Sequence, residues 1–596
     1  ISSLIRIDGK AYRLMGNLPR YAQALDQIRL DVYPTRTIYE FEGAGVDVTL
    51  TFTTPTLPED LDVLSRPVTY LTWDVKSTDG KEHNVDLYFD AAADLTINST
   101  DQTVVWERRD VDGMNILRMG AENQFPLSKK GDDIRIDWGY LYVGTDNSFF
   151  PSSTVAEGKA ARAQFINNGQ LPGMDTQMPR AARDRQPVIA FAFNCGKVTE
   201  KQVVLAVGYD DIYSIQFMGE NLRAWWRRNG ATPEDIFPLV RDQYVSLSQR
   251  CKEFDEELMK DLTDEGGIKY AKLCALAYRE SFAASKVVAD ANGQPLMFCK
   301  ENHSNGCMGT VDVFYPQSPM LIFMAPSLIK ATVAPIMEYT KSPRWKFRFA
   351  PHDVGTYPVA NGQVYGGGER TEENQMPVEE TANMIILLAA IAQMDGSADF
   401  SAPYWTTIVR WADYLREKGF DPENQLCTDD FAGHLAHNIN LSAKAIVALG
   451  AFAKLSEMKG EKIAADIYRK TAQEFAERWV REARDGDHYK LAFDKNGTWS
   501  QKYNLVWDEI LGLGLFPKSV AETEMAFYKK VQKAYGLPLD NRSDYTKLDW
   551  ILWTATLTGK RADFDALLTP VFNFLNATPD RAPMTDWYWT TNAKKQ

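Results

Sequence analysis

The pattern of apolar and polar positions divides the chain into two parts. From residue 1 to about 220, short runs rich in β-branched and aromatic residues alternate with clusters of Pro, Gly, Asn and Asp. This pattern is typical of strands joined by turns, and examples are VDVTLTFTTP, RPVTYLTWDV, HNVDLYFDAAA and KQVVLAVGYD. Several such strands at short spacing predict an antiparallel β-sandwich, which we place at residues 1–225.

From about residue 235 onward, apolar residues recur at the spacing of a helix. Some of these segments are almost entirely apolar, such as MIILLAAIAQM, and others have one charged face, such as IAADIYRKTAQEFAERWVREA. A closed double ring of helices needs both kinds, because inner helices are buried on most faces and outer helices on one. An open solenoid would alternate in the same way, but we find no fixed repeat length. The sequence therefore predicts a toroid at 266–596, joined to the sandwich by a helical linker at 226–265.

Composition narrows the range of partners. The 596 residues carry a net charge of −14, and no basic stretch is large enough for a nucleic-acid interface. No run of 18 apolar residues occurs, so we expect no membrane insertion. The six cysteines are scattered without a C-x-x-C pair, which argues against a structural zinc site. We expect a small-molecule substrate, no cofactor and no metal.

Three long polar loops lie between the predicted helices, at 296–318, 345–377 and 421–440. Loops of this length in a compact domain are usually functional. They hold four of the six histidines, namely His303, His352, His434 and His437. Because histidine is suited to proton transfer near neutral pH, we predict a functional cleft formed by these loops.

Each of these residues also has an ordinary structural explanation. Asp353 can cap a turn, and Asp429 or Asp430 can be the N-cap of the following helix. His434 and His437 can be satisfied core residues. Alternatively, their spacing could place both on one helix face with Asp430, where they could bind zinc or calcium.

Long segments of the chain resemble the glutaminase A family of fungi and gut bacteria. They include LIRIDGKAYRLMG, LPEDLDVLSRPVTYLTWDV, ENHSNGCMGTVDVFYPQSP, GTWSQKYNLVWDEILGLGLFP, YGLPLDNRSDYTKLDWILWTATLTG and PMTDWYWT. The resemblance implies a multidomain β + α fold, in which an antiparallel β-sandwich precedes a six-hairpin (α/α)6 toroid. It also implies hydrolysis of the side-chain amide of L-glutamine to glutamate and ammonia, and a secreted or periplasmic location. The first residues lack the regions of a signal peptide.

The toroid region also resembles, more weakly, the glucosylceramidase-type β-glucosidases. TVDVFYP is similar to their T-Y-D-V-x-F-Y segment and APHDVG to their P-H-D-[LIV]-G segment. TDDFAG is similar to their T-Y-D-G-W segment, whose aspartate is the general acid/base, and this places the role on Asp430. In those β-glucosidases, the nucleophilic glutamate lies shortly before the T-Y-D-V-x-F-Y segment. The nearest glutamate here, Glu301, lies eleven residues before Asp312, with SNGCMG inserted.

These arguments select two sets of residues. The predicted catalytic residues are Asp430, Glu301, Asp312, His352 and Asp353. The predicted substrate-binding residues are His303, Asp429, His434, Arg370, Glu373, Asp508 and Trp507. Arg370 is a candidate for binding a substrate carboxylate.

Three functions fit these residues. A glutaminase-type amidohydrolase needs a base, oxyanion stabilisation and either water or a nucleophile, for which Ser304, Cys307 and Thr310 are candidates. A glycoside hydrolase needs two carboxyl groups flanking the scissile bond, which Asp430 could form with Glu301 or Asp312. The third function is that of a non-catalytic glycan- or peptide-binding protein.

Overall fold

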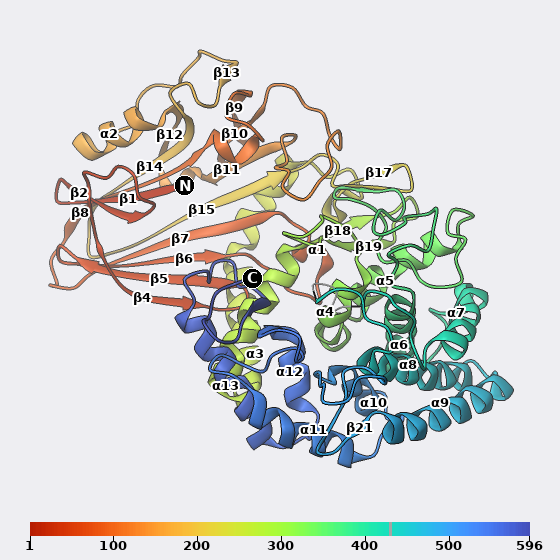
Figure 1. The fold of residues 1–596 in the computed structure, drawn as a ribbon. Helices are drawn as coiled ribbons and strands as arrows, with labels where there is room; N and C mark the ends of the chain where they lie inside the picture. Colours follow the sequence, from red (N-terminus) through yellow and green to blue (C-terminus); the bar gives the residue numbers. More distant parts are fainter. Residues whose placement is uncertain (428–431) are drawn as a thin grey trace. The chain divides into compact units, whose positions relative to one another are not determined.

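The structure is a computed structural model that describes residues 1–427 and 432–596 (Figure 1). The chain forms two compact units, each described by itself below. The first unit comprises Ile1–Ile215, Asn221–Met259 and Ala291–Gly293, and the second comprises Gln216–Glu220, Lys260–Asp290 and Gln294–Gln596.

The first unit is built on two β-sheets, in agreement with the predicted sandwich. The smaller sheet has the strand order β12 (Pro151–Glu157), β14 (Pro187–Val198), β8 (His83–Ala92), β1 (Ser2–Ile7), β2 (Lys10–Met15) and β3 (Gln23–Ala24). The larger sheet has the order β13 (Arg180–Ala181), β9 (Thr103–Val111), β10 (Met114–Ala121), β11 (Tyr140–Asp146), β15 (Glu200–Asp210), β7 (Val68–Ser77), β6 (Val46–Thr53), β5 (Arg36–Gly43) and β4 (Asp26–Val32).

Both sheets of the first unit share one apolar core. Phe89 and Phe191 of the smaller sheet pack in one cluster with Trp73 and Val143 of the larger sheet. Alternate side chains of a strand point to opposite faces, so one face of each sheet can supply this core. The described pairings are antiparallel except that between β2 and β3. The prediction of an antiparallel sandwich is therefore confirmed.

The predicted linker is the first part of a longer helix, α3 (Pro233–Ala283). Phe237 and Val240 of α3 pack against Tyr70 and Tyr142 in a second core cluster of the first unit. The helix is interrupted at Gly267, whose φ of 82° is a conformation that glycine adopts readily. The segment between sandwich and toroid is thus a packed helix whose residues are divided between the two units.

In the second unit, inner helices that follow one another around the ring alternate with a second set of helices. The inner helices are α4 (Val311–Met324), α6 (Pro377–Asp395), α8 (Ile439–Met458), α10 (Val506–Ile510) and α12 (Leu548–Thr556), of which α6 and α8 are almost entirely buried. The helices between and after them are α5 (Pro326–Lys341), α7 (Trp405–Lys418), α9 (Lys462–Glu482), α11 (Lys518–Val531) and α13 (Arg561–Ala577). Short strand pairs accompany them, namely β18 (Ser285–Ala289) with β19 (Pro295–Cys299), β21 (Arg484–Asp485) with β22 (His488–Tyr489), and β23 (Tyr545–Lys547) with β24 (Trp587–Trp589).

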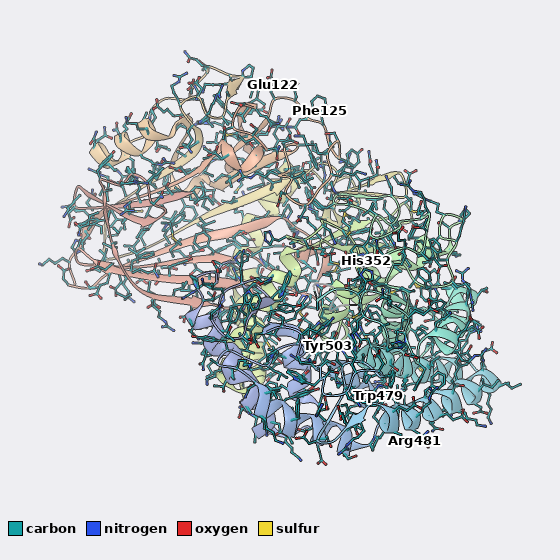
Figure 2. All side chains as sticks on the ribbon, in the orientation of Figure 1. Glu122, Phe125, His352, Trp479, Arg481 and Tyr503 are labelled. Atoms are coloured by element: carbon teal, nitrogen blue, oxygen red, sulfur yellow. The ribbon has the colours of Figure 1, made fainter. Side chains whose placement is uncertain are left out.

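Contacts between successive inner helices establish the ring that the sequence pattern predicts. Helix α4 contacts α6, α6 contacts α8, and α8 contacts the 3-10 turn Tyr503–Leu505, which leads into α10 and contacts α12. Tyr503, labelled in Figure 2, stacks on Trp550 with ring centroids 4.2 Å apart, and both rings are buried. Because an outer helix returns the chain after each inner helix, the inner helices run in the same sense. Their N-termini therefore lie at one end of the ring.

One helix of the described residues, α8, is long and apolar enough to cross a membrane. Its 18-residue window has a mean hydropathy of 1.3, and 94% of that window is buried inside the structure. Helix α8 is therefore the central core helix of the ring, where neighbouring helices cover its apolar side chains.

Candidate active site

Carboxylates lie in the first turns of the inner helices, at the end of the ring where these helices begin. Asp312 is in the first turn of α4, Glu379 and Glu380 in that of α6, Asp508 in that of α10 and Asp549 in that of α12. The N-terminus of a helix carries partial positive charge, which favours negative groups there. The loops predicted to be functional, 296–318, 345–377 and 421–440, are those that lead into α4, α6 and α8.

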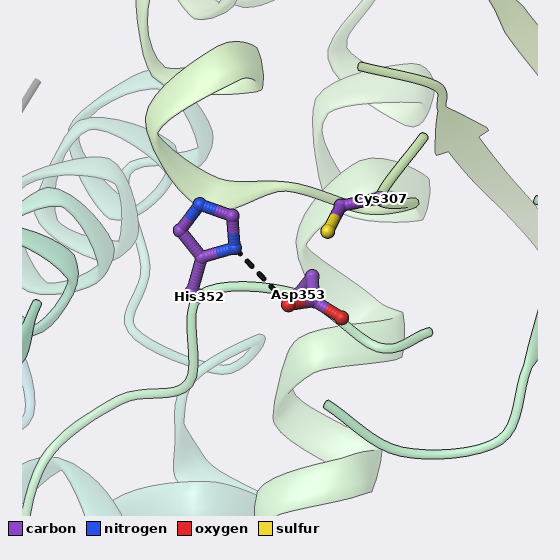
Figure 3. Close-up of side chains that lie close together, drawn as sticks. All are labelled: Cys307, His352 and Asp353. Carbon is purple, nitrogen blue, oxygen red and sulfur yellow. Dashed lines mark hydrogen bonds and ion pairs between the residues drawn. The ribbon is translucent and has the colours of Figure 1, made fainter. Parts of the chain in front are cut away.

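His352 joins two of these loops through its ring nitrogens; its contact with Asp353 is drawn in Figure 3. Its Nδ1 lies 3.1 Å from Oδ2 of Asp353, and its Nε2 lies 3.6 Å from Oδ1 of Asp312. The imidazole is buried and stacks on the ring of Tyr365, with centroids 3.9 Å apart. Burial by itself lowers the pKa of His352, but Asp312 and Asp353 outweigh it and raise this pKa to about 9.

Asp353 is held by four hydrogen-bond donors. Its Oδ1 accepts the backbone N–H groups of Gly355 and Val364 at 2.8 and 3.1 Å. Its Oδ2 accepts that of Tyr365 at 3.1 Å, in addition to the contact with His352. A carboxylate has about four lone-pair sites, so these donors use them all. Such contacts suit a residue that orients His352 rather than one that touches a substrate.

Glu380 lies behind Asp312 in the wall of the ring. The residue is 1% exposed, and its Oε2 accepts a hydrogen bond from the Asn383 side chain at 3.2 Å. Its Oε1 is buried and has no hydrogen-bond partner within residues 1–427 and 432–596. Burial raises the pKa of Glu380 far above its ordinary value, and the neighbouring Asp312 and Glu379 raise it further. One ligand-type atom each of Asp312, His352 and Glu380 lies within 4.8 Å of the others.

A buried ion pair joins helices α8 and α6 next to Glu380. Lys444 of α8 donates to Oε1 of Glu379, and both side chains are excluded from solvent. The ammonium of Lys444 also lies 4.5 Å from the ring centroid of Tyr315, which stacks on Trp507 at 5.9 Å. Trp507, a predicted substrate-binding residue, is 1% exposed, so its contacts are those of a core side chain.

A second group of charges, which the sequence arguments missed, lies at the start of α12. The Nζ atom of Lys547 is 2.7 Å from Oδ2 of Asp586. Burial opposes the charge on Lys547, but Asp586, Asp549 and Asp312 raise its pKa. One ammonium thus pairs with Asp586 and lies within electrostatic reach of two further carboxylates, Asp549 and Asp312.

Two of these carboxylates differ in protonation. Burial and the charge of Asp586 raise the pKa of Asp549 to about 6, although Lys547 opposes them. Burial also acts on Asp586, but Lys547 lowers the pKa of that carboxyl below its usual value. The side chain of Asp586 is 54% exposed and that of Lys547 is 21% exposed, so solvent reaches this group. Both segments, TKLDWILW and PMTDWYWT, resemble stretches of the glutaminase A family, but neither lies in a long polar loop.

The loop before α4 holds Glu301 and His303. Glu301 is half-buried, and its Oε1 accepts hydrogen bonds from the side chains of Ser304 and Asn305. Its charge contributes to the raised pKa of His352, which places it within electrostatic reach of the cluster. His303 is exposed and has a positive φ of 62°.

The candidate nucleophiles of the same loop are poorly placed for attack. Cys307 is 1% exposed, and burial together with Asp353 and Glu301 raises the pKa of its thiol. Thr310 is fully buried, while Ser304 is occupied with Glu301. A thiolate is the reactive form of cysteine, so this environment does not favour a cysteine nucleophile.

The loop before α8 is only partly described. The predicted residues Asp429 and Asp430 lie in 428–431, outside the described residues. Beside this gap, the backbone oxygen of Ala432 accepts a hydrogen bond from Arg542 at 3.3 Å. Arg542 precedes β23 and Lys547, so this end of the loop is tied to the segment that carries the second group of charges.

His434 and His437 lie in this loop and not on a helix. Helix α8 begins at Ile439, and the side chain of its N-cap, Asn438, accepts a hydrogen bond from a backbone N–H of the first turn. The alternative in which the two histidines share a helix face is therefore wrong. His434 is exposed, and Nδ1 of His437 lies 2.7 Å from Oδ1 of Asp421.

The remaining predicted residues lie outside the buried cluster. Arg370 and Glu373 are exposed side chains of the loop before α6. Asp508 accepts the backbone N–H groups of Leu515 and Phe516 at 2.9 and 3.0 Å. These bonds hold the loop that follows α10, and burial, the largest influence, still raises the pKa of Asp508. Its role in substrate binding stays a prediction.

The fold and the carboxylate-rich end of the ring define a hydrolase of the six-hairpin toroid class. Residues 267–596 match the glutaminase A six helical-hairpin domain, and residues 35–261 match a domain of unknown function, DUF5127. Glutaminase A of Aspergillus oryzae (strain ATCC 42149 / RIB 40) is 31% identical over 98% of this chain and 85% of its own length. The chain belongs to the glutaminase A family.

Two further similarities agree with this assignment. A probable glutaminase of Arthroderma benhamiae (strain ATCC MYA-4681 / CBS 112371) is 24% identical over 92% of this chain and 74% of its own length. Among solved structures, a bacterial glucoamylase complexed with acarbose superposes with a TM-score of 0.53 at 11% identity, covering 100% of this chain and 85% of that chain. The second similarity concerns the fold alone. The two glutaminase relatives support an enzyme rather than a non-catalytic binding protein.

Proposed function

We propose that this chain hydrolyses the side-chain amide of L-glutamine, giving glutamate and ammonia. The observation that carries the proposal is the solvent-reached group of Asp549, Lys547 and Asp586 beside Asp312. It combines a carboxyl that titrates near neutral pH with a cation and further carboxylates. The name of the relative from A. oryzae, glutaminase A, supports the choice of substrate.

The chemistry needs an acid and a base but no covalent intermediate. Water attacks the amide carbon, a base takes a proton from that water, and an acid protonates the departing nitrogen, which leaves as ammonia. Asp549, with a pKa of about 6, suits the acid, because it keeps its proton to a higher pH than an ordinary carboxyl and still releases it easily. Asp312, at the start of α4, is our candidate for the base.

Direct attack by water fits the environment of the hydroxyl and thiol groups. The Cys307 thiol is buried and its pKa is raised, and the Ser304 hydroxyl donates to Glu301. An activated nucleophile requires an adjacent base and access to the substrate. A carboxylate base needs no second base to activate it, but it must reach the attacking water.

The same charges suit the ends of an amino acid. Free glutamine carries an α-carboxylate and an α-ammonium group, which need a cation and an anion respectively. Lys547 can bind the former, and Asp586, 54% exposed, can bind the latter. The two groups already lie 2.7 Å apart, so the substrate would exchange one ion pair for two.

A glycoside hydrolase is a second candidate, favoured by a recess in the second unit. Its volume is about 690 Å³, and its lining includes the indole rings of Trp499 and Trp589 together with Asp540 and Arg542. Aromatic faces combined with a few polar groups are typical of ligand sites. The segment 538–544 that lines the recess leads directly into β23 and Lys547.

A paired assay tests both functions. Ammonia release from L-glutamine and sugar release from a glycan panel are measured for the wild-type chain and for Asp549→Asn, Asp312→Asn and Asp430→Asn. We expect ammonia release to fall by about 100-fold or more in the first two variants, since a positioned acid or base contributes about that much. The Asp430 variant tests the acid/base role predicted by the weaker resemblance.

A matched control separates chemistry from a general loss of charge. Asp466 lies on α9 with its side chain 65% exposed, so Asp466→Asn should keep the wild-type rate. Wild-type ammonia release by Asp549→Asn and Asp312→Asn would contradict the proposed mechanism. Release of sugar but not of ammonia by the wild-type chain would establish the second candidate instead. A secreted or periplasmic location stays a proposal from the family resemblance.

A further inference from the structure

We infer that Asp312, His352 and Glu380 form a binding site for one divalent cation of the zinc or manganese type. The inference rests on the donor atoms of these residues and does not depend on the proposed substrate. Two carboxylates and one imidazole are a common ligand set for such ions. They come from the first turns of α4 and α6 and from the loop before α6.

The spacing of the three donor atoms fits a shared ion. Each of the three offers one atom within 4.8 Å of the others. Nε2 of His352 lies 3.6 Å from Oδ1 of Asp312, which is longer than an ordinary hydrogen bond. Two ligands of a tetrahedral zinc ion, each about 2.1 Å from the metal, lie about 3.4 Å apart. The observed distance is close to that between two ligands of one ion.

Glu380 supplies an independent reason for a ligand at this place. Its side chain is almost fully buried, and Oε1 has no hydrogen-bond partner among the residues that the structure describes. A buried polar atom without a partner destabilises the folded state unless something binds it. One carboxylate oxygen of Glu380 lies within 4.8 Å of the Asp312 and His352 donors, so a cation between the three residues would give this carboxylate a partner.

The residues behind the donors are arranged to hold them as ligands. Asp353 fixes Nδ1 of His352 and directs Nε2 toward Asp312, which is the carboxylate–histidine arrangement found behind many metal sites. The stacked ring of Tyr365 holds the imidazole plane. Asn383 donates to the second oxygen of Glu380, so that Oε1 is left for the ion.

A divalent cation also suits the charges of these ligands. Metal ligands bind in their deprotonated forms, so Asp312 and Glu380 would each bring a negative charge to the ion. Lys444 acts on Glu380 from a distance, but its ammonium donates to Glu379. A carboxylate has two oxygens, so Asp312 can hold the ion with one and accept the proton of water with the other.

A second group of possible ligands, Cys307, His352 and Asp353, is less suitable (Figure 3). The four acceptor sites of Asp353 are used by three backbone N–H groups and by His352. The environment of Cys307 favours the thiol, whereas metals bind the thiolate. The inferred site therefore excludes Cys307, and this residue provides a matched control.

Metal binding by the whole chain tests the inference. Protein stripped with EDTA and dialysed is titrated with zinc, manganese and calcium chloride by calorimetry, and its metal content is measured by mass spectrometry. We expect about one tightly bound zinc or manganese ion per chain. Glu380→Gln and His352→Ala should each weaken binding by at least about 100-fold, because each removes a ligand. Cys307→Ser should bind as the wild type does.

Several outcomes would overturn the inference. They are no uptake of zinc or manganese by the stripped wild-type chain, unchanged affinity in Glu380→Gln, or loss of binding in Cys307→Ser. Thermal unfolding and circular dichroism establish that each variant is folded, and Asp312→Asn replaces any variant that is not. Because binding is read without substrate, a failure to hydrolyse glutamine would contradict the proposed function and leave this inference standing.

Discussion

Nδ1 of His352 lies 3.1 Å from Oδ2 of Asp353, and neither side chain is more than 2% exposed. The two residues are adjacent in the sequence, yet their roles differ. Asp353 is bound on all its acceptor sites, whereas His352 presents its second nitrogen to Asp312 on another element. The pair thus connects the loop before α6 with the first turn of α4.

Replacing Asp353 by Asn tests this positioning role. The amide has one oxygen instead of two, so it cannot accept from all four donors, and the imidazole loses its fixed orientation. We expect kcat for glutamine hydrolysis to fall by about 10- to 100-fold with little change in KM. Steady-state kinetics give the two constants separately. A raised KM with unchanged kcat would show that Asp353 acts on substrate binding instead.

The buried pair of Lys444 and Glu379 leads to a prediction on stability. Lys444→Met leaves the carboxylate of Glu379 in a site that is 1% exposed. Removing one partner of a buried ion pair costs about 3–5 kcal/mol, because the other charge stays without compensation. We expect urea denaturation to show a loss of this size in the free energy of unfolding of the second unit.

The double variant Lys444→Met, Glu379→Gln is the control for that experiment. With both charges removed, no uncompensated charge is left in the core, so we expect a large part of the loss to be recovered. A double variant as unstable as the single one would show that Lys444 acts through packing, for example against the Tyr315 ring, and not through its charge.

The raised pKa of Asp549 predicts how hydrolysis depends on pH. As a general acid, Asp549 must be protonated, and its pKa of about 6 means that the active form is lost as the pH rises through that value. We expect kcat to fall by about tenfold for each pH unit above about 6. The measurement is kcat between about pH 4 and about pH 9. In Asp549→Asn this decrease of kcat should be absent. A wild-type kcat that does not change across this pH range would refute the role of Asp549 as the general acid.

His83 in the first unit leads to a different pH dependence. Its hydrogen bonds with Asp8 and Asp79, at 2.7 and 3.1 Å, raise the pKa of the imidazole. Because the pKa of the imidazole is higher in the folded than in the unfolded state, its protonated form stabilises the folded state. This stabilisation is complete below the unfolded-state pKa of about 6.5 and is lost as the pH rises through the folded-state pKa. The same contacts lower the pKa of both aspartates, so their share is lost as the pH falls through the lowered values.

The variant His83→Asn measures this contribution. We expect its melting temperature to be lower than that of the wild type by about 2–4 °C near pH 6, and by less near pH 9, because the charged form of the imidazole is lost as the pH rises. Differential scanning calorimetry at the two pH values gives the comparison. An equal decrease at both would mean that His83 stabilises the first unit by packing alone.

The sequence by itself determined the two structural classes and their order. Alternating β-branched segments such as VDVTLTFT can bury only one face, and the apolar MIILLAAIAQM can be stable only when surrounded. Both features are local, because they depend on the period of the side chains along one element. The position of His352 and Asp312 in long polar loops or at their ends could be predicted for the same reason.

Only the tertiary structure decided which charged groups meet. Lys547, Asp549 and Asp586 stand in segments without long polar loops, and Glu380 opens an apolar helix, so no local pattern distinguishes them from helix caps. They come together because inner helices that run in the same sense bring all their N-termini to one end of the ring. Closure of the ring is a long-range property of packing. The candidate site follows from that closure, and the sequence shows only the residues available to it.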